Sequence, residues 1–363
     1  MTTHGTTAPA APAVRTEPVN RRRLPAVVLS WPGTRALIAV VALFAVSPLF
    51  SLGTISHTAI VSMLPFAALT AVVAVGQTLV IQQGGLDLSV AGAVTLGAVF
   101  AAKLGSSGAV DPIVAVVIAI LVTSLFGVLS GVVVAFLDLP PLVVTIASNA
   151  LMVGLVQAVS GGFSSHAPNQ LSDFALGRWI GLPVLAFGAL AVVLIAQAVL
   201  KLTRIGRRFE LVGENRRAAE YIGVSPKFYT ISAYWLSALL AAAAGVMLAG
   251  LLRIPTLTAG DAYLLPSIAA VVLGGTALTG GRGSIVGTAL GALFLAQLSQ
   301  LVQTFTQSTA VQNIVQALII GVGIVAQLQL GGSTARLKGL VSRKTATSTP
   351  SPSTKNTSKR SVK

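Results

Sequence analysis

The residues best suited to chemistry lie in a few polar stretches of an otherwise apolar chain. The first is VGQTLVIQQGGLDLSVAGAV, residues 75–94, which holds Asp87. The glycine pair before Asp87 permits a tight turn, after which its carboxylate can accept hydrogen bonds from free N–H groups near Ser89 and Val90. We therefore expect Asp87 to cap a helix at a cytoplasmic boundary between two spans. The alternative is a broken helix beside a substrate path, because discontinuous membrane helices often line one. Its candidate residues are Gln77, Thr78, Gln82, Gln83 and Asp87.

A second polar group follows two prolines in DLPPLVVTIASNALMVG, residues 138–154. The prolines end one span and begin the next. Thr145 and Asn149 are four residues apart and therefore share one helix face, with Ser148 close by. Buried hydroxyls and amides need hydrogen-bond partners in a bilayer. Neighbouring helices or a sugar-like ligand would both meet that need, so Thr145 and Asn149 also become candidates for the path.

Other familiar site chemistries are not supported by the sequence. Gly275 and Gly280 have the spacing of a phosphate-binding loop, but Gly281 stands where such a loop needs lysine. A glycine-rich turn is the better interpretation. The chain has no cysteine, and its three histidines are too far apart in sequence to form a ligand set. We expect no catalytic residue, metal or cofactor.

The segment KLTRIGRRFELVGENRRAAEYIGVSPK, residues 201–227, is the long charged segment inside the apolar part of the chain. It holds seven of the 24 lysines and arginines and three of the nine acidic residues. A polar segment between membrane-length runs must lie in water, and its basic excess predicts the cytoplasmic side. We expect this loop to contact a partner.

These sites must be positioned by membrane helices. The chain is 54% hydrophobic and only 9% charged, whereas soluble domains carry about 25% charged residues. The sequence predicts an all-α, polytopic membrane bundle, since about 20 apolar residues cross a bilayer. The ten spans expected on that length are 34–52, 58–82, 88–103, 112–137, 142–160, 179–200, 228–252, 263–275, 284–303 and 311–329. No span carries an ionisable side chain near its midpoint, which argues against a proton-coupled carrier.

Two tails flank the expected permease domain at 34–330. Residues 1–33 and 331–363 are basic and poor in large apolar residues, which predicts disordered cytoplasmic tails. With ten spans both termini lie inside. The coupling loop, about 202–227, then lies inside too. Of the 24 lysines and arginines, 21 are then cytoplasmic, because only Lys103, Arg178 and Arg253 fall outside. The longest outer loop, 161–178, is long enough to form a lip for an extracytoplasmic partner.

Four stretches, taken in order, resemble the permease subunits of bacterial ABC importers of the ribose, xylose and simple-sugar type. They are GQTLVIQQGGLDLSVAG (76–92), LPPLVVTIASNALMVGLVQAVSGG (139–162), GRRFELVGENRRAAEYIGV (206–224) and IAAVVLGGTALTGGRGSIVGTALGALF (268–294). The resemblance covers about residues 40–330. Branched-chain amino-acid permeases form a more distant branch of the same resemblance.

The resemblance implies that residues 206–224 form a coupling loop, whose short helix docks into a groove of a separate ATP-binding subunit. The matching positions are Gly206, Arg207, Gly213, Asn215, Ala218, Ala219 and Gly223. The residues suit that role, because the two alanines allow close approach and Gly223 can end the helix. Arg207, Arg208, Arg216 and Arg217 are placed to pair with an acidic rim on that partner.

The resulting hypothesis is a membrane subunit of an ATP-driven importer, itself without an ATP site, that passes a small polar solute inward across the bacterial cytoplasmic membrane. A monosaccharide like ribose or xylose is the expected solute, and a branched-chain amino acid or another small solute is the alternative. The resemblance also implies a second permease subunit, identical or homologous, and an extracytoplasmic solute-binding protein that sets selectivity.

Two other classes of protein remain open at this stage. A stand-alone secondary carrier or channel would work without an ATPase. A membrane enzyme acting on lipid-linked sugars would need interfacial carboxylates, for which only Asp87 and Asp138 qualify. Nucleic acid is not expected as a partner, because the net charge of +15 lies mainly in the tails and the central loop.

Overall fold

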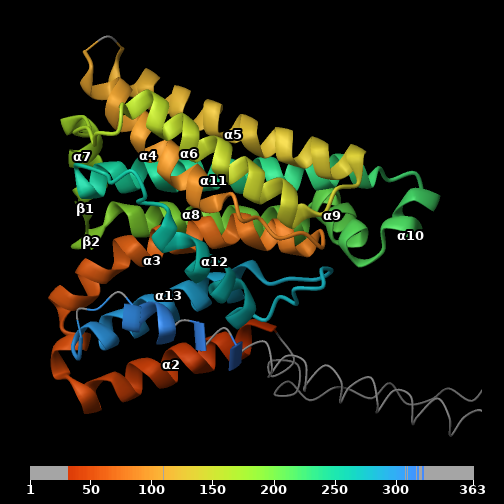
Figure 1. The fold of residues 1–363 in the computed structure, drawn as a ribbon. Coiled ribbons are helices and arrows are strands. Elements are labelled where there is room, and N and C mark those ends of the chain that lie inside the picture. The colour runs from red at the N-terminus through yellow and green to blue at the C-terminus, as the bar shows by residue number, and fades with distance from the viewer. Residues whose placement is uncertain are drawn as a thin grey trace, which may run out of the picture.

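The protein is a bundle of membrane-length helices (Figure 1), here described from a computed structural model for residues 32–108, 110–306, 308, 310–315, 317–318 and 321–322. Seven helices in these residues are long and apolar enough to cross a membrane, and two shorter apolar helices accompany them. The long helices are α2 (Pro32–Phe50), α3 (His57–Gln82), α5 (Pro112–Leu137), α6 (Pro141–Ser160), α8 (Val184–Leu202), α11 (Pro226–Leu252) and α13 (Ile285–Gln303). The shorter ones are α4 (Val90–Ser106) and α12 (Asp261–Leu273).

This architecture confirms the predicted all-α, polytopic membrane bundle. Nine of the ten expected spans coincide with these nine helices, and the eighth is short, as the sequence indicated. The tenth, 311–329, falls largely outside the described residues, as do the two expected tails. A 3₁₀ turn, η1 (Leu52–Ile55), joins α2 to α3.

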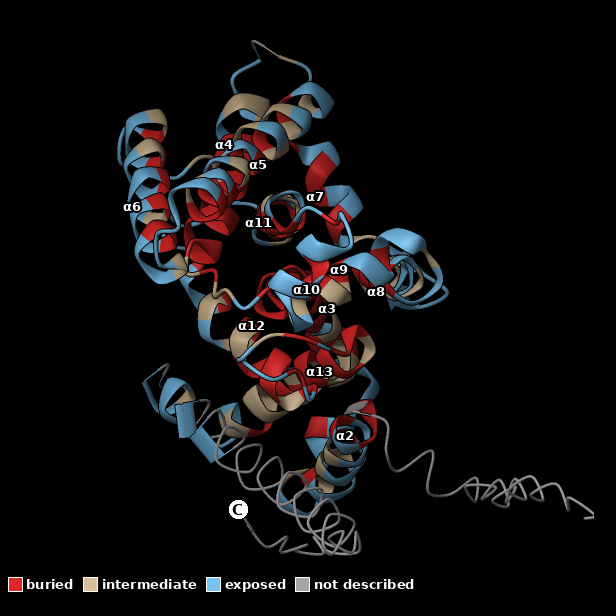
Figure 2. Cartoon of the chain, turned by 90° about the vertical axis from the view of Figure 1, so that its right-hand side faces the viewer, coloured by how far each residue is buried: buried red, intermediate tan, exposed pale blue. Residues whose placement is uncertain are grey.

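Two helices, α3 and α11, form the centre of the bundle (Figure 2). In the most apolar stretch of each helix, 72% of the residues of α3 and 56% of those of α11 are buried inside the protein. The corresponding shares are only 22% for α8 and 28% for α6. The outer helices instead expose large side chains such as Leu121, Leu151 and Leu194. Since lipid tails are as apolar as leucine, these exposed leucines form the lipid-facing surface of a membrane protein.

Small residues let the central helices approach closely. A Cβ added at Gly97 of α4 would lie 2.6 Å from the carbonyl oxygen of Ala242 in α11, and one at Gly245 of α11 would lie 2.1 Å from that of Val94. Close backbone contact of this kind replaces the hydrophobic driving force that helices lack in lipid. The glycines of α4 and α11 therefore fix the spacing of the core.

The two ends of the bundle differ (Figure 1). One end carries α9 (Arg204–Glu214) and α10 (Arg216–Tyr221), and the other carries α7 (Asn169–Leu176) and a hairpin of β1 (Arg178–Trp179) and β2 (Leu182–Pro183). We call these the α9–α10 end and the α7 end. The loop expected at 161–178 thus contains a helix. The hairpin was not expected, although its turn residues Ile180 and Gly181 have the positive φ angles, 53° and 77°, typical of tight two-residue turns.

Candidate coupling surface and translocation site

The predicted coupling loop is folded as two short helices whose ends are fixed by the residues singled out from the sequence. Thr203 Oγ1 accepts from Gly206 N at 3.1 Å and begins α9, where any side chain at Gly206 would meet the carbonyls of the preceding turn. Asn215 Oδ1 accepts from Ala218 N at 3.0 Å and begins α10. Gly223, at φ 76°, follows the end of α10, as predicted.

This segment has a buried and an exposed face. Phe209, Val212 and Ala219 are buried and hold the two helices against the bundle. On the outer side Ala218, Arg207, Arg208 and Arg217 are exposed, and the tip carries two apolar side chains, Tyr221 at 91% exposure and Ile222 at 66%. An exposed aromatic side chain surrounded by arginines is typical of the anchors that dominate protein interfaces.

Arg216 differs from the other arginines with which it was grouped. Its Nη2 donates to the carbonyl oxygen of Gln83 at 3.1 Å and lies 3.3 Å from Thr230 Oγ1. Arg216 is exposed as a residue, but its guanidinium is bound to the protein itself, a contact that the sequence did not predict.

Asp87 lies deeper than the sequence predicted. It is 1% exposed, and its Oδ2 accepts from Ser237 Oγ at 2.8 Å. Ser237 lies eleven residues after Pro226 in the 27-residue α11, which is about 17 Å along the helix. The expected boundary position is therefore wrong, and an ionisable group sits near the middle of the bundle, supplied by a connection rather than by a span. The expected hydrogen bond is present, because Oδ1 accepts from Ser89 N at 2.9 Å.

Thr145 and Asn149 of α6 both face this connection. Thr145 Oγ1 donates to the carbonyl of its own helix at Pro141, 2.9 Å away, and lies 3.4 Å from the carbonyl oxygen of Leu86. Asn149 Oδ1 accepts from the backbone N–H of Gly92 at 2.8 Å and so caps the buried start of α4 from a neighbouring helix. Of the two partners left open by the sequence, neighbouring helices are the ones observed.

Gln77 and Thr78 lie inside the bundle on α3. Thr78 Oγ1 donates to the Ala74 carbonyl at 2.7 Å and lies 2.9 Å from Thr288 Oγ1 of α13. Gln77 is fully buried, and neither its amide oxygen nor its amide nitrogen has a hydrogen-bond partner among the described residues. A buried amide without partners costs free energy, so Gln77 is available to a ligand or to water.

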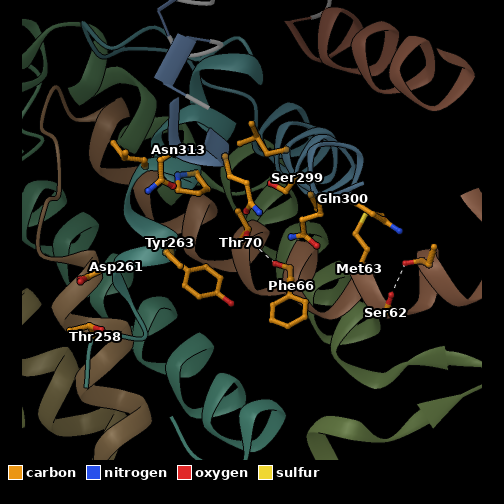
Figure 3. Close-up of a pocket in the computed structure, with 18 residues that line it drawn as sticks. Ser62, Met63, Phe66, Thr70, Thr258, Asp261, Tyr263, Ser299, Gln300 and Asn313 are labelled. Atoms are coloured by element: carbon orange, nitrogen blue, oxygen red, sulfur yellow. Dashed lines mark hydrogen bonds between the residues drawn. The ribbon is translucent and has the colours of Figure 1, made fainter. Parts of the chain in front are cut away.

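A cavity of ≈ 860 Å³ lies towards the α7 end, between α3, α12 and α13 (Figure 3). Its lining combines aromatic, hydroxyl and amide groups. The lining residues with such groups or a charge are Ser62, Phe66, Thr70, Thr258, Asp261, Tyr263, Ser299, Gln300, Gln303, Gln312 and Asn313.

None of the seven path candidates from the sequence lines this cavity. Gln77 comes nearest, since it follows Thr70 by seven residues and shares its face of α3. The lining residues were missed because each is isolated in an apolar run and only the fold brings them together. The helical spacing of Met63, Phe66 and Thr70 was the available signal.

The arrangement defines a class of protein: a multi-pass membrane permease with a hollowed end and, at the opposite end, a basic helical surface suited to a partner. The chain belongs to the family described as branched-chain amino acid transport system / permease component, whose family model matches residues 59–324. The match includes the cavity and the coupling segment.

Curated relatives agree with that assignment. The ribose import permease protein RbsC of Haemophilus influenzae is 32% identical over 304 residues, which cover 82% of this chain and 93% of the relative. RbsC of Escherichia coli K12 is 35% identical over 79% of this chain and 90% of its own length. The fructose import permease protein FruF of Bifidobacterium longum is 30% identical over 68% of this chain and 70% of its own. No solved structure matches the chain.

Family membership confirms a transport subunit rather than an enzyme, and it confirms the resemblance to importer permeases. A permease component of this kind implies separate ATP-binding and solute-binding partners. It is also a multi-pass membrane protein, in agreement with the fold.

Proposed function

We propose that this chain is the membrane subunit of an ATP-driven importer for a neutral hydroxylated solute, a monosaccharide such as ribose, in a bacterial cytoplasmic membrane. The observation that carries the proposal is the cavity lining, taken together with the similarity to ribose and fructose import permeases. Amides and hydroxyls exchange hydrogen bonds with sugar hydroxyls, and the rings of Phe66 and Tyr263 offer apolar faces to the sugar C–H groups.

The same lining disfavours an amino acid. Asp261 is the charged side chain among the cavity-lining residues, and neither lysine nor arginine is among them. An amino acid is a zwitterion: Asp261 suits its ammonium group, but its carboxylate is best bound by a cation, which the lining lacks. We therefore place the branched-chain amino-acid alternative second.

Polar lining also supports a second permease subunit. Asp261 is exposed at the cavity, and a charged group is costly in contact with lipid tails. We propose that a second copy or a homologue covers this side, so that two subunits enclose the path. Gln77 would then form its deeper part, whereas Thr78, Asp87, Thr145 and Asn149 hold the helices that frame it.

The proposed orientation has the α9–α10 end and both termini in the cytoplasm. Lys103, Arg178 and Arg253 all lie towards the α7 end, consistent with few basic residues outside. In this orientation the exposed residues of 206–224, with Tyr221 at the tip, dock on the ATP-binding subunit. The α7 end, with its hairpin, faces the solute-binding protein.

Uptake by proteoliposomes tests this function. The chain, reconstituted with its ATP-binding and solute-binding subunits, should take up labelled ribose in an ATP-dependent manner and should not take up leucine. Gly223→Arg should insert normally and abolish coupled uptake, whereas Gly188→Ala, at an open site on α8, should behave as wild type. Accumulation of solute against a gradient by the chain alone would refute the proposal in favour of a secondary carrier.

A further inference from the structure

The connection between α3 and α4, residues 83–89, is held on one side by the coupling segment. Gln83 is 3% exposed, and its side-chain Nε2 donates to the carbonyl oxygen of Phe209 in α9 at 2.9 Å. Its own carbonyl accepts from Arg216 Nη2 of α10 at 3.1 Å. Gln83 is therefore bonded to both coupling helices: its side chain bonds to α9, and its backbone carbonyl bonds to the Arg216 guanidinium of α10.

A second attachment lies one residue earlier. The carbonyl oxygen of Gln82 accepts from Gly281 N at 3.0 Å, and a Cβ at Gly213 of α9 would lie only 2.3 Å from that oxygen. The neighbouring Arg282 forms an ion pair with Glu214 at the end of α9. The glycine-rich turn and α9 thus both contact the C-terminus of α3 closely.

The other side of the connection is held by the membrane core. A Cβ at Gly85 would lie 2.3 Å from the hydroxyl oxygen of Tyr234 in α11. Beyond it, Asp87 bonds to Ser237 of α11. A few residues therefore link the partner-facing surface to the centre of the bundle.

Between the two attachments stands Gly84, whose side-chain position is open. Gly84 has φ 77°, in the left-handed region that favours glycine, and no atom lies within 4 Å of the position its Cβ would occupy. Its neighbours Gln83 and Gly85 are both fixed by the contacts above. The N–H of Gly84 is held by the Ile81 carbonyl oxygen at 2.9 Å, so the bend between the two attachments is built on this glycine.

We propose that residues 83–89 transmit the movement of the coupling helices to the membrane core, with Arg216 as the positioning residue and Gly84 as the pivot. This inference rests on the proposed coupling role of 206–224. When the ATP-binding partner displaces α10, Arg216 carries the Gln83 carbonyl with it. The turn at Gly84 then moves Asp87 relative to Ser237, which shifts the start of α4 against α11.

The test measures coupling in the reconstituted transporter, as solute taken up per ATP hydrolysed. Arg216→Ala should still co-purify with the ATP-binding subunit and hydrolyse ATP within about twofold of wild type, while uptake per ATP falls at least tenfold. Arg216→Lys, which keeps one donor, should recover part of the loss. Arg204→Ala removes an exposed arginine outside the docking surface proposed at 206–224 and should leave the ratio unchanged.

A second variant keeps the inference testable if Arg216→Ala does not fold. Gly84→Ala meets no atom but disfavours the left-handed conformation, so uptake per ATP should fall at least threefold with assembly intact. Equal losses of hydrolysis and uptake in Arg216→Ala, or a wild-type ratio in either variant, would overturn the transmission role. Uptake by the wild-type chain without any ATPase would instead refute the proposed function itself.

Discussion

Asn149→Ala is the substitution that best separates a framework role from a solute-binding role for the polar face of α6. The change removes the acceptor of the Gly92 N–H, the third residue of α4, while the next N–H, that of Ala93, bonds to Ser89 O at 2.9 Å. Gly92 is buried, so its N–H would be left without a partner away from water. The expected result is a loss of stability without a change in solute affinity.

Two estimates bracket the expected loss in the free energy of unfolding. A buried donor left unsatisfied costs about 1–3 kcal/mol in soluble proteins. Hydrogen bonds between membrane helices average only about 0.6 kcal/mol, with a maximum near 1.7, because the unfolded chain in the membrane also finds partners. The Gly92 N–H belongs to a helix start that cannot find an intrahelical partner, so we expect a value near the upper membrane limit, about 1.5 kcal/mol.

Equilibrium unfolding in mixed micelles of detergent and SDS, followed by circular dichroism, measures this loss. Asn149→Ser keeps a hydroxyl oxygen as an acceptor near the helix N-terminus and should lose less than Asn149→Ala. Ile146→Ala, on the lipid-facing side of the same helix at 56% exposure, is the matched truncation and should lose little. An unfolding free energy equal to wild type, combined with a raised KM for uptake, would refute the framework role and assign Asn149 to the solute.

Three further outcomes follow from the geometry. Gly245→Ala places a Cβ 2.1 Å from the Val94 carbonyl oxygen and should cost about 1–3 kcal/mol, seen as a lower thermal midpoint in detergent, whereas Gly154→Ala at an open site should not. Tyr221→Ala should weaken binding of the ATP-binding subunit at least tenfold in a titration without lowering that midpoint, because its side chain is 91% exposed. Gln77→Leu removes two buried atoms without partners and should raise the midpoint while raising KM for uptake; a lowered midpoint would show that the amide is satisfied within the protein.

The spans were predictable because the thickness of the bilayer sets the length of the apolar run that each membrane-crossing helix needs. Nine apolar runs of suitable length became nine helices, and even the short α12 was recognised as short. The ends of α10 were predictable for a similar reason, since Asn215 and Gly223 are residues that begin and end helices through local backbone geometry.

The depth of Asp87 was not predictable by the same reasoning. Hydropathy shows where an apolar run ends, and the run of α3 ends at the glycine pair before Asp87. Hydropathy does not show that the chain then turns back into the bundle. That position depends on Ser237, 150 residues away, and on the room left by Gly85 beside Tyr234. The contact of Arg216 within the chain was missed for the same reason, because its acceptor at Gln83 is 133 residues away.

The shared geometry of α3 explains how two distant ends can act together. Thr70, at the cavity, and Gln82, at the coupling segment, are twelve residues apart on one helix, about 18 Å. All the residues from Ala71 to Gln82 are buried, so this stretch has no lipid-facing side along which to bend. In the transmission that we propose, this buried stretch carries a displacement of Gln82 to Thr70, whereas the connection beyond Gln82 turns at Gly84 and acts on α4 and α11. The contact between the coupling segment and the end of α3 would thereby move α3 and the α4–α11 pair by different amounts. Such unequal movement is the condition for opening one end of the path while closing the other.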